Sequence, residues 1–146
     1  MTGAVAADVK ILSKAAAHER IAELQQQLER VRFDMDREVA LFNATVRQKP
    51  IGLLVQKQQD QLVYLRWKWQ GDRGGRSRYV MLDSAPVKKW LQVQESPVRR
   101  LYFRFARVVV YLNHLYACHR MELKRLGVYL EQLDAIPSSE NPPEFR

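Results

Sequence analysis

The chain has 146 residues, of which 47% are hydrophobic and 27% charged, a balance typical of a soluble globular protein. A single cysteine, Cys118, excludes an internal disulfide and favours a reducing cytoplasm. No apolar run approaches the roughly 20 residues that cross a bilayer, and the N-terminus lacks the pattern of a signal peptide, so no membrane association is expected.

The formal net charge of +8 is unevenly distributed along the chain. Residues 1–48 carry seven basic and seven acidic side chains, whereas residues 49–136 carry sixteen basic and seven acidic ones. A local excess of positive charge attracts polyanions such as nucleic acids. The alternative interpretation is that this charge serves only solubility.

A long amphipathic helix is predicted over residues 8–48. Pro50 ends it, because a proline disfavours helical backbone in the residue before it. A helix of about 40 residues would be about 60 Å long, so we expect part of it to project or to pair with a second copy in a homodimer. Its apolar residues recur at steps of three and four, on one helix face; they are Leu24, Leu28, Val31, Met35, Val39, Phe42 and Val46.

A small antiparallel sheet is predicted over residues 51–82. Apolar and polar side chains alternate between Leu62 and Gln70, which is strand periodicity. The glycine-rich loop over residues 71–75 suits a hairpin turn, and residues 76–82 would form the return strand. If residues 53–57 also pair, the hairpin becomes a three-stranded meander, which is more stable than an isolated hairpin.

Two further helices are predicted, a short one over residues 84–93 and a long one over residues 96–134. Each begins with a serine suited to a helix cap, Ser84 or Ser96, and has a proline in its first turn. The tail, residues 137–146, is polar and proline-rich, and we expect it to be disordered. The long helix has an apolar stripe at steps of three and four, which comprises Leu101, Phe105, Val108, Leu112, Leu115, His119, Leu123, Leu126, Leu130 and Leu133.

These elements predict one domain over residues 1–136, of the α+β class and mostly helical. The two long helices are expected to pack antiparallel and to flank the small antiparallel hairpin or meander. The short helix would lie with the sheet at one end of the helix pair.

Catalytic and metal-binding patterns are weak, so we expect no enzyme activity, no cofactor and no metal site. His114, Cys118 and Glu122 fall at i, i+4 and i+8 on one helix face, a spacing that suits metal ligands. No second cluster in the sequence would complete the coordination. An enzyme with a site between the helices would need a polar pocket near His114 and Glu122.

Basic residues of the hairpin and the last helix form the predicted nucleic-acid site. A two-stranded ribbon fits the major groove of DNA, and arginine binds both phosphates and guanine edges. We expect DNA to be bound on a surface shared between the hairpin and the first turns of the last helix, with Trp67 and Trp69 in the core. The candidate residues are Arg66, Lys68, Arg73, Arg76, Arg78, Arg100, Arg104 and Arg107.

Four short motifs follow the long first helix. They are Pro50-Ile51-Gly52-Leu53-Leu54, Leu65-Arg66-Trp67-Lys68, Trp90-Leu91 and Leu112-Asn113-His114-Leu115. With them, residues 42–130 resemble a bacterial domain family of unknown function, some of whose members are named integrase regulator R protein. The resemblance implies an accessory protein of an integrative and conjugative element that regulates integration, excision or transfer. The family has no established catalytic residues to carry over.

The sequence therefore favours a non-enzymatic, cytoplasmic accessory protein of a bacterial mobile element that binds DNA through its basic hairpin and an arginine stripe. The alternative is a helical protein–protein interaction module. In that case the first helix pairs with itself or with a partner, and the chain has no nucleic-acid role.

Overall fold

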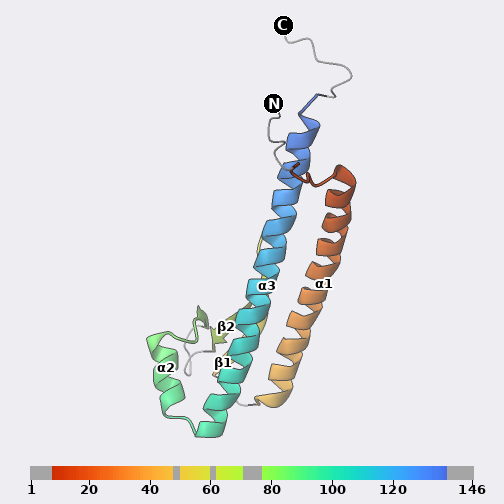
Figure 1. Cartoon of the computed structure of the whole chain (residues 1–146). Helices are drawn as coiled ribbons and strands as arrows, with labels where there is room; N and C mark the ends of the chain where they lie inside the picture. Colours follow the sequence, from red (N-terminus) through yellow and green to blue (C-terminus); the bar gives the residue numbers. More distant parts are fainter. Residues whose placement is uncertain (1–7, 48–49, 60–61, 71–76, 138–146) are drawn as a thin grey trace.

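Two long antiparallel helices lie side by side, with a small sheet and a short helix at one end (Figure 1). The computed structural model describes residues 8–47, 50–59, 62–70 and 77–137. This arrangement confirms the predicted mostly helical α+β fold. The elements are α1 (Lys14–Thr45), β1 (Ile51–Lys57), β2 (Val63–Trp69), β3 (Arg78–Val80), α2 (Ala85–Gln92) and α3 (Ser96–Asp134).

Helix α1 begins six residues later than the sequence predicts. Ser13 is its N-cap, and its side chain accepts a hydrogen bond from the Ala16 N–H at 3.1 Å. Such a cap satisfies one of the amide groups that the first helical turn leaves without a partner, so the helix begins after it. The predicted apolar face is confirmed, because its members are buried except for the partly buried Val39.

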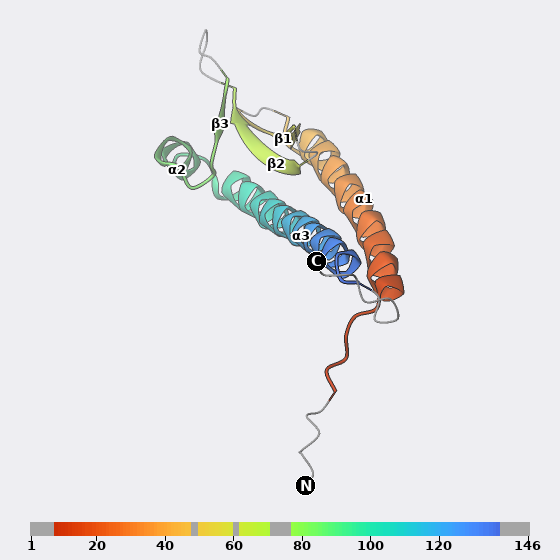
Figure 2. The ribbon, with the colours of Figure 1, turned by 90° about the horizontal axis from the view of Figure 1, so that it is seen from above.

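The sheet is an antiparallel meander in the order β1-β2-β3, with α1 and α3 on one side of it (Figure 2). The alternation predicted for β2 is confirmed, since Val63, Leu65 and Trp67 are buried against the helices. Trp69 is partly buried and packs against the same core. Of the described part of the predicted return strand, residues 77–82, only Arg78–Val80 is strand.

An aromatic cluster joins the sheet to both long helices. The Phe42 ring meets Trp67, Tyr102 and Phe105 edge to face, with ring centroids 5.5, 5.7 and 5.1 Å apart. Tyr102 is fully buried, and its hydroxyl donates a hydrogen bond to the Ile51 carbonyl oxygen at 2.9 Å. Burial raises the pKa of Tyr102, so the phenol stays neutral and its polar end is satisfied.

The short helix α2 lies within the predicted range, and Val87 and Leu91 bury its apolar side. Trp90 meets the Tyr102 ring at 5.5 Å between centroids. Ser84 is the N-cap residue, yet its hydroxyl has no hydrogen-bond partner among the described residues.

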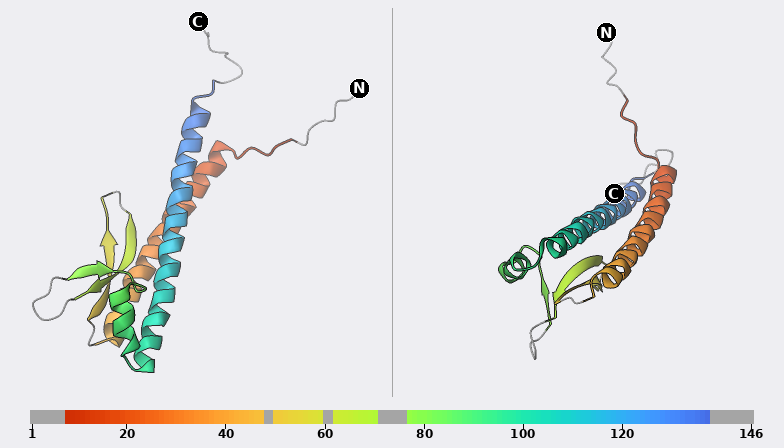
Figure 3. Two further views of the ribbon diagram at one scale, coloured as in Figure 1. Left: turned by 90° about the vertical axis from the view of Figure 1, so that its left-hand side faces the viewer. Right: turned by 90° about the horizontal axis from the view of Figure 1, so that it is seen from below.

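The buried face of α3 differs from the predicted stripe. Tyr102, Val109 and Tyr116 are buried, whereas Leu101 and Val108 are only partly buried. Helix α3 packs against both α1 and β2, which lie on the same side of it (Figure 3), so its buried face spans the two contacts. Its N-cap is also Glu95 instead of Ser96. Of the predicted tail, residues 137–146, only the first lies within the described residues.

Candidate nucleic-acid interface

The sheet has an outer face that points away from the long helices and carries polar and aromatic side chains. Because neighbouring side chains of a strand point to opposite faces, Tyr64, Arg66 and Lys68 lie opposite the buried residues of β2. The register pairs Lys68 with Tyr79 on β3 and Tyr64 with Gln56 on β1. We call these five residues, Gln56, Tyr64, Arg66, Lys68 and Tyr79, the outer patch.

Arg66 lies at the centre of the outer patch. Its guanidinium carbon is 4.1 Å from the centroid of the Tyr79 ring and 5.5 Å from that of Tyr64. Its Nη1 donates a hydrogen bond to Gln56 Oε1 at 2.8 Å. These partners are uncharged, so they orient the guanidinium without neutralising it.

The strands around the outer patch carry positive charge only. Their sequences contain the basic residues Lys57, Arg66, Lys68 and Arg78 and no acidic residue. Of the described carboxylates, none lies within 4.0 Å of a basic group of these strands. A local excess of positive charge of this kind attracts polyanions.

The arginine stripe of α3, Arg100, Arg104 and Arg107, is exposed but lies on another side of the molecule. At about 100° per residue, Asn113 lies on the opposite side of the helix from Arg104, and Asn113 is hydrogen-bonded to β2. The stripe therefore faces away from the sheet. Among the described residues, the basic side chains of the sheet and those of the stripe therefore do not form one shared surface.

Acidic residues of α1 lie near the arginine stripe. Burial raises the pKa of Glu38, while the nearby charges of Arg104 and Arg37 partly offset that shift. A groove between the long helices is lined by Asp34 and Glu38 together with Arg37. The field there is mixed in sign, so it suits a polyanion less well than the outer patch.

Two of the eight predicted site residues, Arg73 and Arg76, lie outside the described residues. Arg78 is described, and it is exposed on the three-residue strand β3. Sequence reasoning missed the tyrosines as part of the site. Tyr64 shares the strand face of Arg66, and this alternation is the signal that identifies it.

The residues considered as metal ligands do not converge. His114 Nε2 is 3.6 Å from Cys118 Sγ, whereas the Glu122 carboxylate accepts hydrogen bonds from Arg20 at 2.6 and 2.9 Å. Those hydrogen bonds lower the pKa of Glu122. Within the described part of the chain, no group of three or more histidine, cysteine or acidic residues could hold a metal ion.

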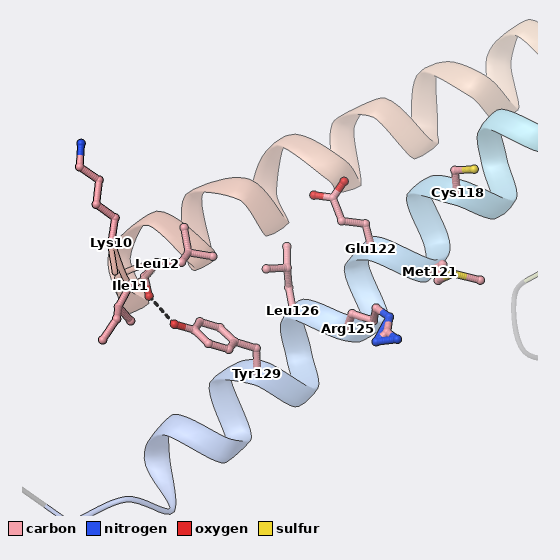
Figure 4. Close-up of a pocket in the computed structure, with 9 residues that line it drawn as sticks. All are labelled: Lys10, Ile11, Leu12, Cys118, Met121, Glu122, Arg125, Leu126 and Tyr129. Carbon is pink, nitrogen blue, oxygen red and sulfur yellow. Dashed lines mark hydrogen bonds between the residues drawn. The ribbon is translucent and has the colours of Figure 1, made fainter. Parts of the chain in front are cut away.

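A groove of about 730 Å³ lies at the far end of the helix pair, between α3 and the segment before α1 (Figure 4). Its walls are largely apolar, and the Tyr129 hydroxyl donates a hydrogen bond to the Leu12 carbonyl oxygen at 2.6 Å. Glu122 lines it, but His114 does not, so it is not the polar pocket that the enzyme hypothesis requires. The lining residues are Lys10, Ile11, Leu12, Cys118, Met121, Glu122, Arg125, Leu126 and Tyr129.

None of the described helices is long and apolar enough to span a membrane. Comparisons of the chain with models of protein families, with curated proteins and with solved structures give no match. The resemblance to the integrase regulator R family therefore stays a prediction.

Proposed function

We propose that this protein binds nucleic acid, most simply DNA, through the outer patch of its sheet. The observation that supports this best is the position of Arg66 and Lys68 on the outer face of three strands that have no acidic residue. Such side chains contact phosphates, release counterions from the nucleic acid and so provide affinity.

The alternative, pairing through the apolar face of α1, receives less support. That face is buried within the chain, since Leu24, Met35 and Phe42 are each 0% exposed. A second copy would have to displace α3 or the sheet to reach it. Homodimerisation through this face is therefore the weaker candidate function.

The biological setting we propose is the one that the resemblance implies, a bacterial mobile element whose integration, excision or transfer the protein regulates in the cytoplasm. Its support is the set of sequence motifs alone. An integrase or conjugation gene beside the gene for this chain would favour this setting, and a neighbourhood without either would count against it.

Fluorescence anisotropy of a labelled DNA oligonucleotide with the whole chain tests the binding function. Raising the salt from about 50 to about 200 mM should lower the affinity about 10- to 150-fold, if about two to four phosphates are neutralised. Absence of binding at low salt, or binding that salt does not change, would overturn the proposal.

A charge reversal tests the location. Lys68→Glu should weaken binding, because it removes a phosphate contact and introduces repulsion at the outer patch. Lys124→Glu is the matched control, since it makes the same change of charge at an exposed position of α3. Equal losses from the two variants would show that only the net charge matters.

A further inference from the structure

Two tyrosines, Tyr64 and Tyr79, flank Arg66 on the outer patch, and Tyr79 is the more exposed of the two. Tyr79 is 41% exposed, and the guanidinium of Arg66 lies over its ring. The ring therefore contributes little to the core. The exposed part of the Tyr79 ring is a flat aromatic surface on which another planar group can stack, and Lys68 Nζ lies 5.9 Å from the centroid of the same ring.

Nucleic acids differ in whether they offer such a planar group. A duplex presents phosphates and base edges, because its base faces are stacked inside the helix. A single strand exposes the faces of its bases, which stack on aromatic rings and on arginine. Tyr64 and Tyr79 add contacts for a single strand and none of comparable kind for a duplex.

A cavity of about 590 Å³ opens beside the outer patch, where β3 ends and leaves part of β2 uncovered. Arg66, Trp67 and Asn113 line it together with Asp83. The carboxylate of Asp83 repels phosphate but can accept a hydrogen bond from a base amino group. The cavity is within the range of volumes that hold small-molecule ligands, so it has room for a base.

We propose that the outer patch is a platform for single-stranded nucleic acid. Bases stack on Tyr79, Arg66 and Tyr64, and the charges of Arg66 and Lys68 hold the phosphates. Sheets with exposed aromatic side chains hold about two or three unpaired bases in this way. This inference rests on the proposed function and names the class of nucleic acid that the same site takes.

The test compares labelled oligo(dT), oligo(U) and a DNA duplex of the same length with the whole chain at one salt concentration. Oligo(dT) or oligo(U) should bind at least about 10-fold more tightly than the duplex, since stacking adds to the phosphate contacts. A duplex that binds as tightly as both single strands, or more tightly, would overturn the inference.

Substitutions at Tyr79 separate stacking from charge. Tyr79→Leu should weaken single-strand binding about 5- to 150-fold, the usual effect of losing one stacked base. Tyr79→Phe keeps the ring and should stay within about twofold, and Tyr79→Trp should bind at least as tightly as the unchanged protein. Thermal unfolding verifies that each variant is folded. If Tyr79→Leu fails to fold, weaker binding by a folded Tyr79→Trp overturns the inference.

Inorganic polyphosphate serves as a probe of charge alone, and Tyr79→Leu should weaken its binding much less than it weakens single-strand binding. Duplex binding that Lys68→Glu weakens, with no effect of Tyr79→Leu on any nucleic acid, would overturn the single-strand inference and leave the proposed function intact. No binding of any nucleic acid at low salt would overturn both.

Discussion

The side-chain amide of Asn113 on α3 forms hydrogen bonds with the backbone of Leu65 on β2, as a residue of a neighbouring strand would. The Leu65 N–H donates to Asn113 Oδ1 at 2.7 Å, and Asn113 Nδ2 donates to the Leu65 carbonyl oxygen at 3.0 Å. Strand β3 pairs with β2 only over residues 67–69, so Leu65 has no partner on that side. A primary amide offers the same donor and acceptor as a peptide group. This pair of hydrogen bonds fixes the sheet, and with it the outer patch, to the helix pair.

Asn113→Leu is expected to destabilise the protein by about 1–3 kcal/mol, because it leaves two partly buried backbone groups of Leu65 without partners. Urea unfolding monitored by tryptophan fluorescence measures the change. His114→Leu, one residue further along the same helix and exposed, is the control and should stay within about 0.5 kcal/mol. Equal stabilities for the two variants would contradict the assigned role of Asn113.

Phe42→Ala should cost about 3–5 kcal/mol, because Phe42 is 0% exposed and its ring contacts three others. A loss of that size approaches the whole stability of a small domain, so thermal unfolding should begin well below that of the unchanged chain. Phe33→Ala on the same helix removes an equal ring that is 61% exposed, and it should have little effect. Similar melting temperatures for both variants would show that the aromatic cluster does not hold the sheet in place.

Two glutamates should give opposite pH dependences of stability. Hydrogen bonds from Arg20 lower the pKa of Glu122 below the ordinary 4.5. The ionised Glu122 therefore stabilises the fold above that pH, and this stability is lost as the pH falls through the lowered pKa. Burial raises the pKa of Glu38, so its ionisation costs stability as the pH rises through the raised value. Urea midpoints across acid pH measure both effects.

In that series Glu122→Gln should reduce the loss of stability that accompanies acidification below about pH 4.5. Glu38→Gln should instead reduce the loss that accompanies a rise in pH above the same value. Identical profiles for the two variants would rule out the contrast between these environments.

Removal of positive charge should matter more at the outer patch than on the arginine stripe. The double variants Arg66→Glu/Lys68→Glu and Arg100→Glu/Arg107→Glu each lower the formal net charge from +8 to +4. We expect the first to weaken oligonucleotide binding by at least about 10-fold more than the second, because direct phosphate contacts outweigh distant charge at moderate salt. Anisotropy titrations compare the two variants. A larger loss of affinity in the second variant would show that the binding site lies on α3.

Periodicity predicts the buried face of a helix when the buried residues form one continuous apolar stripe. The apolar face of α1 meets α3 and the sheet along a single stripe, and its members from Leu24 to Val46 follow from spacing alone. The buried face of α3 spans contacts with α1 and β2 and includes Tyr102 and Tyr116. Tyrosine has an apolar body and a polar end, so spacing does not show whether it is buried.

The candidate site is predictable only in part for a related reason. Strand alternation places Tyr64, Arg66 and Lys68 on one face. Tyr79 joins them through the register in which the three-residue strand β3 pairs with β2. Helical periodicity also predicts the angular position of Arg104 relative to the other residues of its helix. It does not predict which side of that helix the sheet covers. The separation of the stripe from the outer patch is therefore a property of the packed structure.

The most direct test of nucleic-acid binding at the outer patch is amide and side-chain NMR of the labelled protein during titration with oligo(dT). Binding at the outer patch should centre the shift changes on Tyr64, Arg66, Lys68 and Tyr79 and leave Arg100, Arg104 and Arg107 unchanged. Changes centred on the three arginines of α3, with the outer patch unaffected, would contradict it.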